Sequence, residues 1–314
     1  MRPELEPNRH STRQLGDNGR RGLAGEVSSS AEVVSLRPTT CTRNSSSSAG
    51  KNGDTEHSRI CEICGGSDTT QLESYTVSKW PVVSCDDCNF VYLGRVPDYD
   101  LLNTEYAWEK TFANESKKRA QKLWGAFDQV TRLRTKIGRL IDNAGQRRSI
   151  GSTGRVLEIG CGGSTRIASG PTPYGIEISE ALAHQAGAVF TARGGKVIHA
   201  PAIDGLAQFP DGFFDAVLMR SYLEHEAQPR KVLSDTRRTL KPGGIAYVRV
   251  PNYGSLNRRV MGTKWCGFRF PDHVNYFSSK DLRRLAASCG FTYRCINWFS
   301  PFDDNLIVEL RAGP

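Results

Sequence analysis

The chain has 314 residues, of which 38% are hydrophobic, and a formal net charge of +9. Its length permits one sizeable core with a small additional domain. No run of about 18 apolar residues occurs, and the first residues carry two glutamates where a signal peptide needs a basic and then an apolar segment. Nine cysteines are too sparse for a disulfide scaffold. We therefore expect a cytoplasmic protein without membrane insertion.

Residues 1–58 are rich in Ser, Arg and Gly and poor in aromatic side chains. Such a composition buries too little apolar surface to offset the entropy lost on ordering. We predict a disordered tail over 1–58.

Two Cys-x-x-Cys pairs follow the tail, Cys61 with Cys64 and Cys85 with Cys88. Four thiolates at this spacing are typical of a zinc ribbon, which has a closed and structural coordination. A redox role would instead favour one pair at a strand-to-helix turn. We predict a zinc-ribbon module over residues 59–95 that binds structural Zn²⁺.

A linker and a basic amphipathic helix are predicted over 96–150. Apolar side chains recur at three- and four-residue steps over 114–145, with Asn114 as a possible cap and Gly145 as the predicted end. Residues 115–148 hold ten Lys or Arg against three acids, a net charge of +7. Such a face is either simply solvated or attracts RNA phosphates.

Short apolar runs alternate with helical patterns over residues 151–314. The last two runs are joined only by SPFDD, too short for a parallel crossover. We predict an α/β fold, a Rossmann-like, seven-stranded and mostly parallel sheet with an antiparallel last strand and helices between the first five strands. The predicted strands are 155–160, 174–178, 196–200, 214–219, 244–250, 291–299 and 305–310.

The stretch RVLEIGCGGSTRI, residues 155–167, places a glycine turn directly after the first of these strands. Such a turn exposes backbone N–H groups to an anionic ligand, and a following helix would add its positive dipole end. Glu177 ends the second strand, where doubly wound folds place an acid for ribose hydroxyls. The two features together indicate a nucleotide-type cofactor.

Four motifs, RVLEIGCGG, YGIEIS, FPDGFFDAVLMRSYLEH and LKPGGIAYVRVPN, resemble in order and spacing the class I S-adenosylmethionine-dependent methyltransferases. The resemblance covers about residues 114–314. It implies S-adenosylmethionine as cofactor. The chain departs from the family pattern in the few residues that separate Gly162 from Gly175, so we expect a short first helix. Arg166 would either pair with the cofactor carboxylate or be solvated. The residues that the resemblance assigns to cofactor binding are Glu158, Gly160, Cys161, Gly162, Glu177, Ile178, Ala202 and Ser221.

Methyl transfer is an in-line displacement, so alignment of donor and acceptor can supply much of the acceleration. A base is needed only where the acceptor must lose a proton. His225 is the first candidate because the ordinary pKa of an imidazole is near neutrality, and the alternative is that Glu224 and His225 order the loop. The predicted catalytic residues are His225, His273 and Tyr222.

A long connection, residues 251–277, follows the fifth strand and precedes a helix predicted to start near Ser279 with a capping box from Ser278 to Asp281. Its aromatic side chains either contact the acceptor or pin the loop onto the sheet. The aromatic residues are Trp265, Phe268, Phe270, Tyr276 and Phe277, and interleaved Arg258, Arg259, Arg269 and His273 suggest an anionic or sugar-like acceptor.

SYLEH, residues 221–225, resembles the small-molecule branch that includes ubiquinone-pathway O-methyltransferases. The predicted function is methyl transfer to a small, anionic or carbohydrate-linked acceptor. Two alternatives stay open: an RNA base methyltransferase whose ribbon and basic helix hold the nucleic acid, and a noncatalytic zinc-ribbon binding protein. The methylated atom and the oligomeric state are not predictable from the sequence.

Overall fold

A computed structural model of the chain describes a defined part of the 314 residues. Most of the predicted tail over 1–58 and most of the predicted helix over 114–145 lie outside that part, and both stay predictions. Residues 34–35 and 57–58 of the tail are described and form short strands. The described residues are 34–35, 57–76, 80–96, 138, 140, 142–297 and 303–313.

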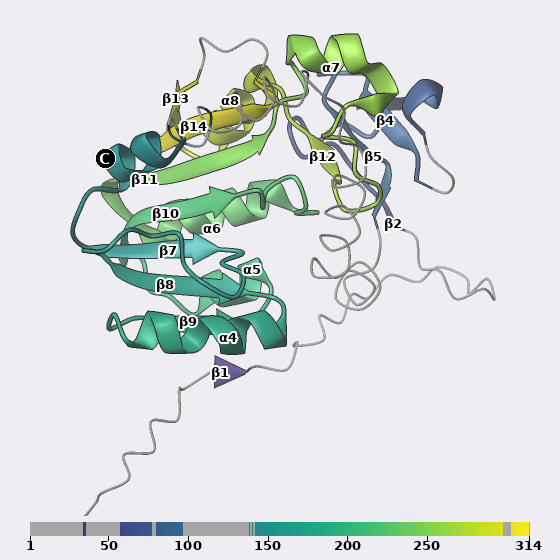
Figure 1. The fold of residues 1–314 in the computed structure, drawn as a ribbon. Coiled ribbons are helices and arrows are strands. Elements are labelled where there is room, and N and C mark those ends of the chain that lie inside the picture. Colours follow the sequence, from purple (N-terminus) through teal and green to yellow (C-terminus); the bar gives the residue numbers. More distant parts are fainter. Residues whose placement is uncertain are drawn as a thin grey trace, which may run out of the picture. The chain divides into compact units, whose positions relative to one another are not determined.

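One twisted sheet carries the predicted α/β fold (Figure 1). Every strand pair in it is parallel except the two made by the last strand, so the mostly parallel sheet with an antiparallel last strand is confirmed. In spatial order the strands are β1 (Val34–Ser35), β9 (Lys196–His199), β8 (Thr172–Glu177), β7 (Arg155–Ile159), β10 (Phe214–Arg220), β11 (Leu240–Pro251), β14 (Asn305–Ala312) and β13 (Phe291–Cys295).

The chain leaves β7 toward β8 on one side and later returns to β10 on the other. This reversal is a topological switch point, and open parallel sheets bind ligands outside the carboxyl ends of the strands there. The strand order therefore places the ends of β7, β8 and β10, which carry the predicted site residues, at the expected position for a ligand.

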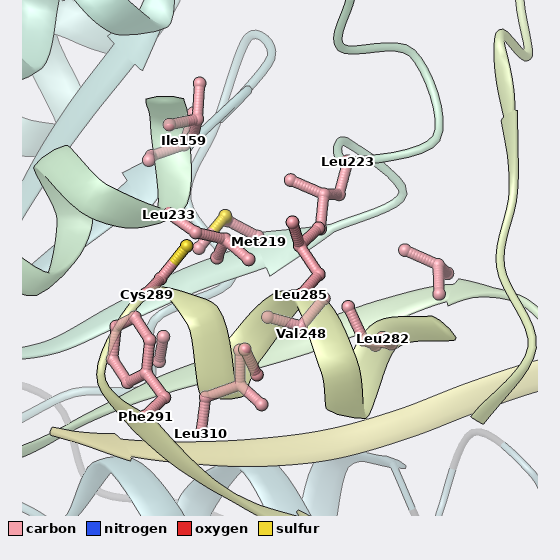
Figure 2. Close-up of a cluster of buried hydrophobic side chains, with 14 of the residues drawn as sticks. Ile159, Met219, Leu223, Leu233, Val248, Leu282, Leu285, Cys289, Phe291 and Leu310 are labelled. Carbon is pink, nitrogen blue, oxygen red and sulfur yellow. The ribbon is translucent and has the colours of Figure 1, made fainter. Parts of the chain in front are cut away.

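Helices cover both faces of the sheet. One face packs against α5 (Ala202–Ala207), α6 (Pro229–Thr239) and α8 (Ser279–Ser288). Figure 2 shows part of this core, where Leu282 and Leu285 of α8 lie against Val248 and Leu310. The other face packs against α4 (Glu180–Thr191) and the helical residues 142–150. The predicted capping box of α8 is present, with the side chains of Ser278 and Asp281 satisfying each other's backbone N–H groups.

The short helix predicted after β7 is absent from residues 160–171, which form turns and bends. The prediction was wrong because two carboxylates replace the helical hydrogen bonds. Glu158 accepts from the Arg166 N–H at 3.0 Å, and Glu177 accepts from the Gly162 N–H at 2.7 Å. The loop therefore presents no helix dipole to a ligand.

Gly145 does not end the helix that precedes β7, because helical residues continue to 150. A Cβ at this glycine would lie 3.1 Å from the Tyr247 hydroxyl oxygen and 3.3 Å from Ile296 Cγ2. The glycine therefore allows close packing of helix against sheet, a role that a sequence pattern does not distinguish from a helix end.

Of the four cysteines, Cys61, Cys64 and Cys88 lie outside strands, and Cys85 ends a strand of a second, smaller sheet. Its strands are β3 (Thr69–Gln71), β4 (Val82–Cys85), β5 (Val91–Leu93) and β12 (Asn275–Tyr276), and the short strands β2 (His57–Ser58) and β6 (Arg95–Val96) pair beside it. β12 belongs to the long connection after β11, yet it pairs antiparallel with β5. The connection also contains α7 (Leu256–Met261) and the 3₁₀ turn η2 (Gly262–Lys264). In the described part of the chain, no helix combines the length and the apolar character needed to cross a bilayer.

Arg59 fastens the cysteine-containing segment to the rest of the protein. Its guanidinium donates to the Leu93 and Val274 carbonyl oxygens at 3.3 and 2.9 Å, and to the Ala227 carbonyl and Asn275 Oδ1, each at 2.9 Å. One acceptor, Leu93, belongs to the cysteine-containing segment, and the others belong to the rest of the chain. One side chain therefore joins segments more than two hundred positions apart.

Replacing Arg59 by Met should lower the free energy of unfolding by about 3 kcal/mol, because several partly buried acceptors lose a charged donor. Chemical denaturation at equal metal content measures the change. Arg148→Met, at an exposed helical position, is the control and should stay within about 0.5 kcal/mol of wild type. Equal losses in both variants would contradict the role of Arg59 as the fastening residue.

Candidate functional site

The glycine turn at the end of β7 is shaped for close approach. Gly160 has φ +70° and Gly162 has φ +65°, a backbone region that side chains disfavour. A Cβ on Gly160 would lie 3.2 Å from Cδ2 of Tyr222, so the ring packs directly over the turn. The structure thus brings Gly160, Gly162 and Tyr222 together at the switch point.

Glu177, at the end of β8, organises this turn. Its Oε2 accepts from the Gly162 N–H at 2.7 Å and its Oε1 accepts from the Ser179 N–H at 3.0 Å. The side chain is only 6% exposed. A carboxylate in this position fixes the turn, and it lies where the resemblance expects an acid for ribose hydroxyls.

Glu158 lies inside β7 and is 2% exposed. Its Oε2 accepts from the Thr165 hydroxyl at 3.1 Å and from the Arg166 N–H at 3.0 Å. Burial nevertheless raises the pKa of this carboxyl to about 7, since loss of hydration outweighs these hydrogen bonds and the nearby Arg166 charge. Glu158 therefore holds the loop after β7 while its own charge is poorly solvated.

The remaining predicted cofactor residues surround the same edge. The Ile178 carbonyl contacts His199 Nε2 at 3.0 Å, and Ala202 is buried at the start of α5. Cys161 is 7% exposed and lies against Gly175 of β8, since a Cβ on that glycine would be 2.9 Å from the Cys161 sulfur. Asp204, two positions after Ala202, is exposed on α5.

Ser221 directly follows β10 and has φ +54°, which is strained for a residue with a side chain. Its N–H donates to the Arg249 carbonyl at 2.8 Å, so the neighbouring strand holds this conformation. The next residue, Tyr222, donates its hydroxyl to Glu226 Oε2. Backbone strain of this kind concentrates at functional sites, which supports a ligand near the end of β10.

The sequence did not reveal a polar network beside this site. Arg220, the last residue of β10, donates to Asp142 Oδ2 at 2.5 Å and to Gln146 Oε1 at 2.7 Å, and its Nε is buried without a hydrogen bond in the described part of the chain. Arg249, its partner in register on β11, has Nε 3.6 Å from Asp142. The sequence indicates only that an Arg at the end of a buried strand needs a partner. It does not identify Asp142 and Gln146 as that partner, although 142 and 146 share one helix face.

His225 and His273 are brought together from distant parts of the sequence, with ring centroids 4.7 Å apart. His225 Nδ1 lies 2.9 Å from the Asp272 carbonyl oxygen, and His273 Nδ1 lies 2.8 Å from that of Gly267. Burial lowers the pKa of His225 to about 4. Both rings are therefore neutral at pH 7, and His225 is a weaker base than its residue type suggests.

The aromatic side chains of the long connection mainly pack inward. Trp265, Tyr276 and Phe277 are at most 2% exposed, and the first two belong to one apolar cluster with Val82 and Leu93 of the small sheet. Arg258 donates to the Tyr253 carbonyl at 2.9 Å. This packing favours the interpretation that the aromatic residues pin the connection in place.

Cys61, Cys64, Cys85 and Cys88 have sulfur atoms within 4.8 Å of one another, and none of them is in a disulfide. Both pairs form the same turn. The Gly65 N–H donates to the Cys61 carbonyl at 2.8 Å and the Asn89 N–H to the Cys85 carbonyl at 2.9 Å. Gly65 and Asn89 have φ +83° and +63°. Four convergent thiols on matched turns fit the tetrahedral ligand set of Zn²⁺.

Known proteins are similar to parts of this chain. A family model described as "Methyltransferase domain" matches residues 130–296. An uncharacterised protein of Methanocaldococcus jannaschii is 30% identical over 44% of this chain and 64% of its own length. A ubiquinone biosynthesis O-methyltransferase of Dechloromonas aromatica is 33% identical over 42% of this chain and 62% of its own length. The chain thus spans less than two thirds of each relative.

Among solved structures, a SAM-dependent methyltransferase of Archaeoglobus fulgidus is 18% identical, with a TM-score of 0.43, over 64% of this chain and 99% of that one.

The raised pKa of Glu158 predicts a pH-dependent stability. Between its ordinary value of 4.5 and about 7, the native state holds a proton that the unfolded state releases. The free energy of unfolding therefore falls as pH rises through this window, by up to about 3 kcal/mol from this group. Denaturation series without cofactor should show a flatter slope for Glu158→Gln, whereas Glu180→Gln, exposed at the start of α4, should keep the wild-type slope. Identical slopes in all three proteins would refute the assignment.

Proposed function

We propose, from the premise that this chain belongs to the methyltransferase-domain family, that it transfers the methyl group of S-adenosylmethionine to a small, anionic or carbohydrate-linked acceptor. The observation that carries the proposal is the pairing of the glycine turn after β7 with the Glu177 carboxylate after β8 at the switch point of the sheet. Both are needed for a nucleoside-type ligand, since the turn permits close approach and the carboxylate can accept hydrogen bonds from hydroxyl groups.

S-adenosylmethionine, when bound, supplies a methyl group on a positively charged sulfur. In the proposal Glu158, Gly160, Cys161 and Gly162 line its amino-acid end and Glu177 accepts from its ribose hydroxyls. The other proposed cofactor residues are Ile178, Ala202 and Ser221. These three residues are proposed from their position, because they lie just beyond the carboxyl ends of β8, β9 and β10.

The acceptor is proposed to lie over the end of β10. Tyr222 would position it from the side of the glycine turn, and His225 or His273 would accept a proton where the acceptor must lose one. The neutral state of both rings and the low pKa of His225 favour positioning over strong base catalysis. Most of the acceleration would then come from alignment in a site with little water.

The polar network favours an anionic acceptor. Arg220 and Arg249 lie in register at the ends of β10 and β11, with Arg166 close enough to interact electrostatically with both. Asp142 pairs with Arg220 and Arg249, and the buried carboxyls of Glu158 and Glu224 also interact with these guanidinium groups. Burial raises the pKa of Glu158 to about 7 and that of Glu224 to about 8, which favours their neutral forms, so the group retains positive charge. A carboxylate or phosphate on a ligand would complement it. The similarity to a ubiquinone biosynthesis O-methyltransferase also favours a small acceptor.

We also propose that the four cysteines hold one Zn²⁺ with a structural role. Cys61, Cys85 and Cys88 are buried, and a tetrahedral sphere of four thiolates is complete without a water ligand. The ion would fix the small sheet that carries β12 of the long connection. In this way a structural metal would shape the acceptor side of the site.

Calorimetric titration with S-adenosylmethionine tests the cofactor proposal. Wild type should bind it, and Glu177→Ala should weaken binding by about 1 to 3 kcal/mol because hydrogen bonds to a charged acceptor are lost. Glu180→Ala is the matched control and should bind as wild type does. Failure of the wild type to bind would favour the noncatalytic alternative. A shift in affinity with bulk RNA, and none with pooled nucleotide-sugars, would favour the RNA alternative.

Metal analysis tests the zinc proposal. The double variant Cys61→Ser/Cys64→Ser should contain one equivalent of zinc less per chain than wild type, because two of four thiolates are gone. Cys266→Ser, at an exposed position outside the cluster, should keep the wild-type content. Unchanged zinc in the double variant would contradict the four-cysteine site.

A further inference from the structure

We propose that Glu224, His225 and His273 form a second metal site, one that binds a divalent transition-metal ion and keeps coordination positions open. The site is distinct from the four cysteines, and it lies at the acceptor side of the sheet, beyond the end of β10. Metal binding itself does not depend on methyl transfer.

The backbone holds the three residues in one place. Glu224 and His225 lie in the turn after β10, whereas His273 lies just before β12. The N–H groups of Val274 and Asn275 both donate to the Glu224 carbonyl, at 2.8 and 3.1 Å. These two hydrogen bonds lock the segment that carries His273 against the turn that carries the other two residues.

The ligand atoms already converge. One imidazole nitrogen of each His and one carboxylate oxygen of Glu224 lie within 4.8 Å of one another. Ligand atoms around one Zn²⁺ are about 3.3 Å apart, given bonds of about 2.0 to 2.1 Å. Any two ligand atoms would therefore have to approach each other by at most about 1.5 Å to close the cluster around an ion.

The hydrogen bonds of the two rings select the tautomer that metals require. A carbonyl oxygen only accepts, so Nδ1–H of His225 donates to Asp272 and Nδ1–H of His273 donates to Gly267. In each neutral ring the lone pair is then on Nε2. Ligating histidines in metalloproteins show this outer arrangement, in which the other ring N–H is fixed by a carbonyl or carboxylate.

Glu224 gives an independent indication of a ligand. The side chain is 1% exposed, and its Oε2 is buried without a hydrogen-bond partner in the described part of the protein. A buried carboxylate oxygen without a partner costs free energy, and ligation of a cation would remove that cost. The nearest cationic side chains are already engaged by acids, Arg269 with Asp272 at 2.9 Å and Arg249 with Asp142 at 3.6 Å.

The ligand set indicates the class of ion. Two imidazoles and one carboxylate suit Zn²⁺, Fe²⁺, Co²⁺ or Mn²⁺, whereas Mg²⁺ and Ca²⁺ prefer an all-oxygen sphere. Three protein ligands leave positions for water or for an acceptor oxygen, as in catalytic rather than structural sites. An acceptor hydroxyl bound to the ion would lose its proton to water more readily, and with the ion bound neither histidine would act as the base. This last role rests on the proposed function, but the ion site does not.

Metal counting on the full chain tests the site. Protein purified with zinc at the cysteines is titrated with Co²⁺ alone, followed by elemental analysis and visible absorption. Total metal in wild type should reach two equivalents per chain, and the added cobalt should show ligand-field bands without thiolate charge transfer. Glu224→Gln and His273→Gln should stop at one equivalent. His184→Gln, at an exposed position on α4, is the matched control and should reach two.

If total metal in the wild type stops at one equivalent per chain, the site is overturned. This result needs no variant, so misfolding of a variant cannot leave the question open. Two equivalents in both Glu224→Gln and His273→Gln would also overturn it, and the cluster would then be a hydrogen-bonded support for the loop. Cofactor calorimetry on the same samples separates the two proposals. Metal binding without S-adenosylmethionine binding would remove the proposed function and leave the ion site, and the reverse result would remove only the ion site.

Discussion

Burial of three carboxylates at one edge of the sheet is the constraint on which the site depends. Glu158, Glu177 and Glu224 are 2%, 6% and 1% exposed. Glu158 lies in β7, Glu177 ends β8, and Glu224 lies in the turn after β10. Taking a carboxylate out of water is costly unless donors or cations replace the water. Glu158 and Glu177 meet this need with N–H groups of the loop after β7 and of Ser179, which is why that loop contains no helix. Glu224 meets it only in part, and the proposed ion site follows from that difference.

The small sheet and the large sheet are not separate structures joined by a linker. Side chains of β4 and β5 alternate, so that Val83 and Tyr92 join the main core while Val82 and Leu93 pack with Trp265 and Tyr276 of the long connection. β4 and β5 are therefore buried on both faces. A change at the proposed zinc site would therefore reach the proposed acceptor side through these contacts and through Arg59.

The sequence predicted the parts of the fold that follow from periodicity and local chemistry. All seven strands after residue 150, the antiparallel pairing of the last two and the capping box of α8 depend on nearby residues, and all are present. The missing helix after β7 and the role of Gly145 were not predictable, because both depend on side chains from other strands. The same holds for the contacts of Arg220 with Asp142 and Gln146, which only tertiary packing brings together. The residues expected to bind cofactor converge at one edge, but their roles stay predictions.

The position of β12 has a consequence for the order of folding during synthesis. Until residues 275–276 leave the ribosome, β5 lacks a neighbour on one side, and its unpaired backbone is open to pairing with other chains. The hydrogen bonds of Arg59 to Val274 and Asn275 also cannot form until these residues have been synthesised. The N-terminal cysteine segment thus has a high contact order and completes its structure late, even though it is translated early. Early capture of an ion by the cysteines would protect this segment in the interval, by holding it in a compact form before its last strand arrives.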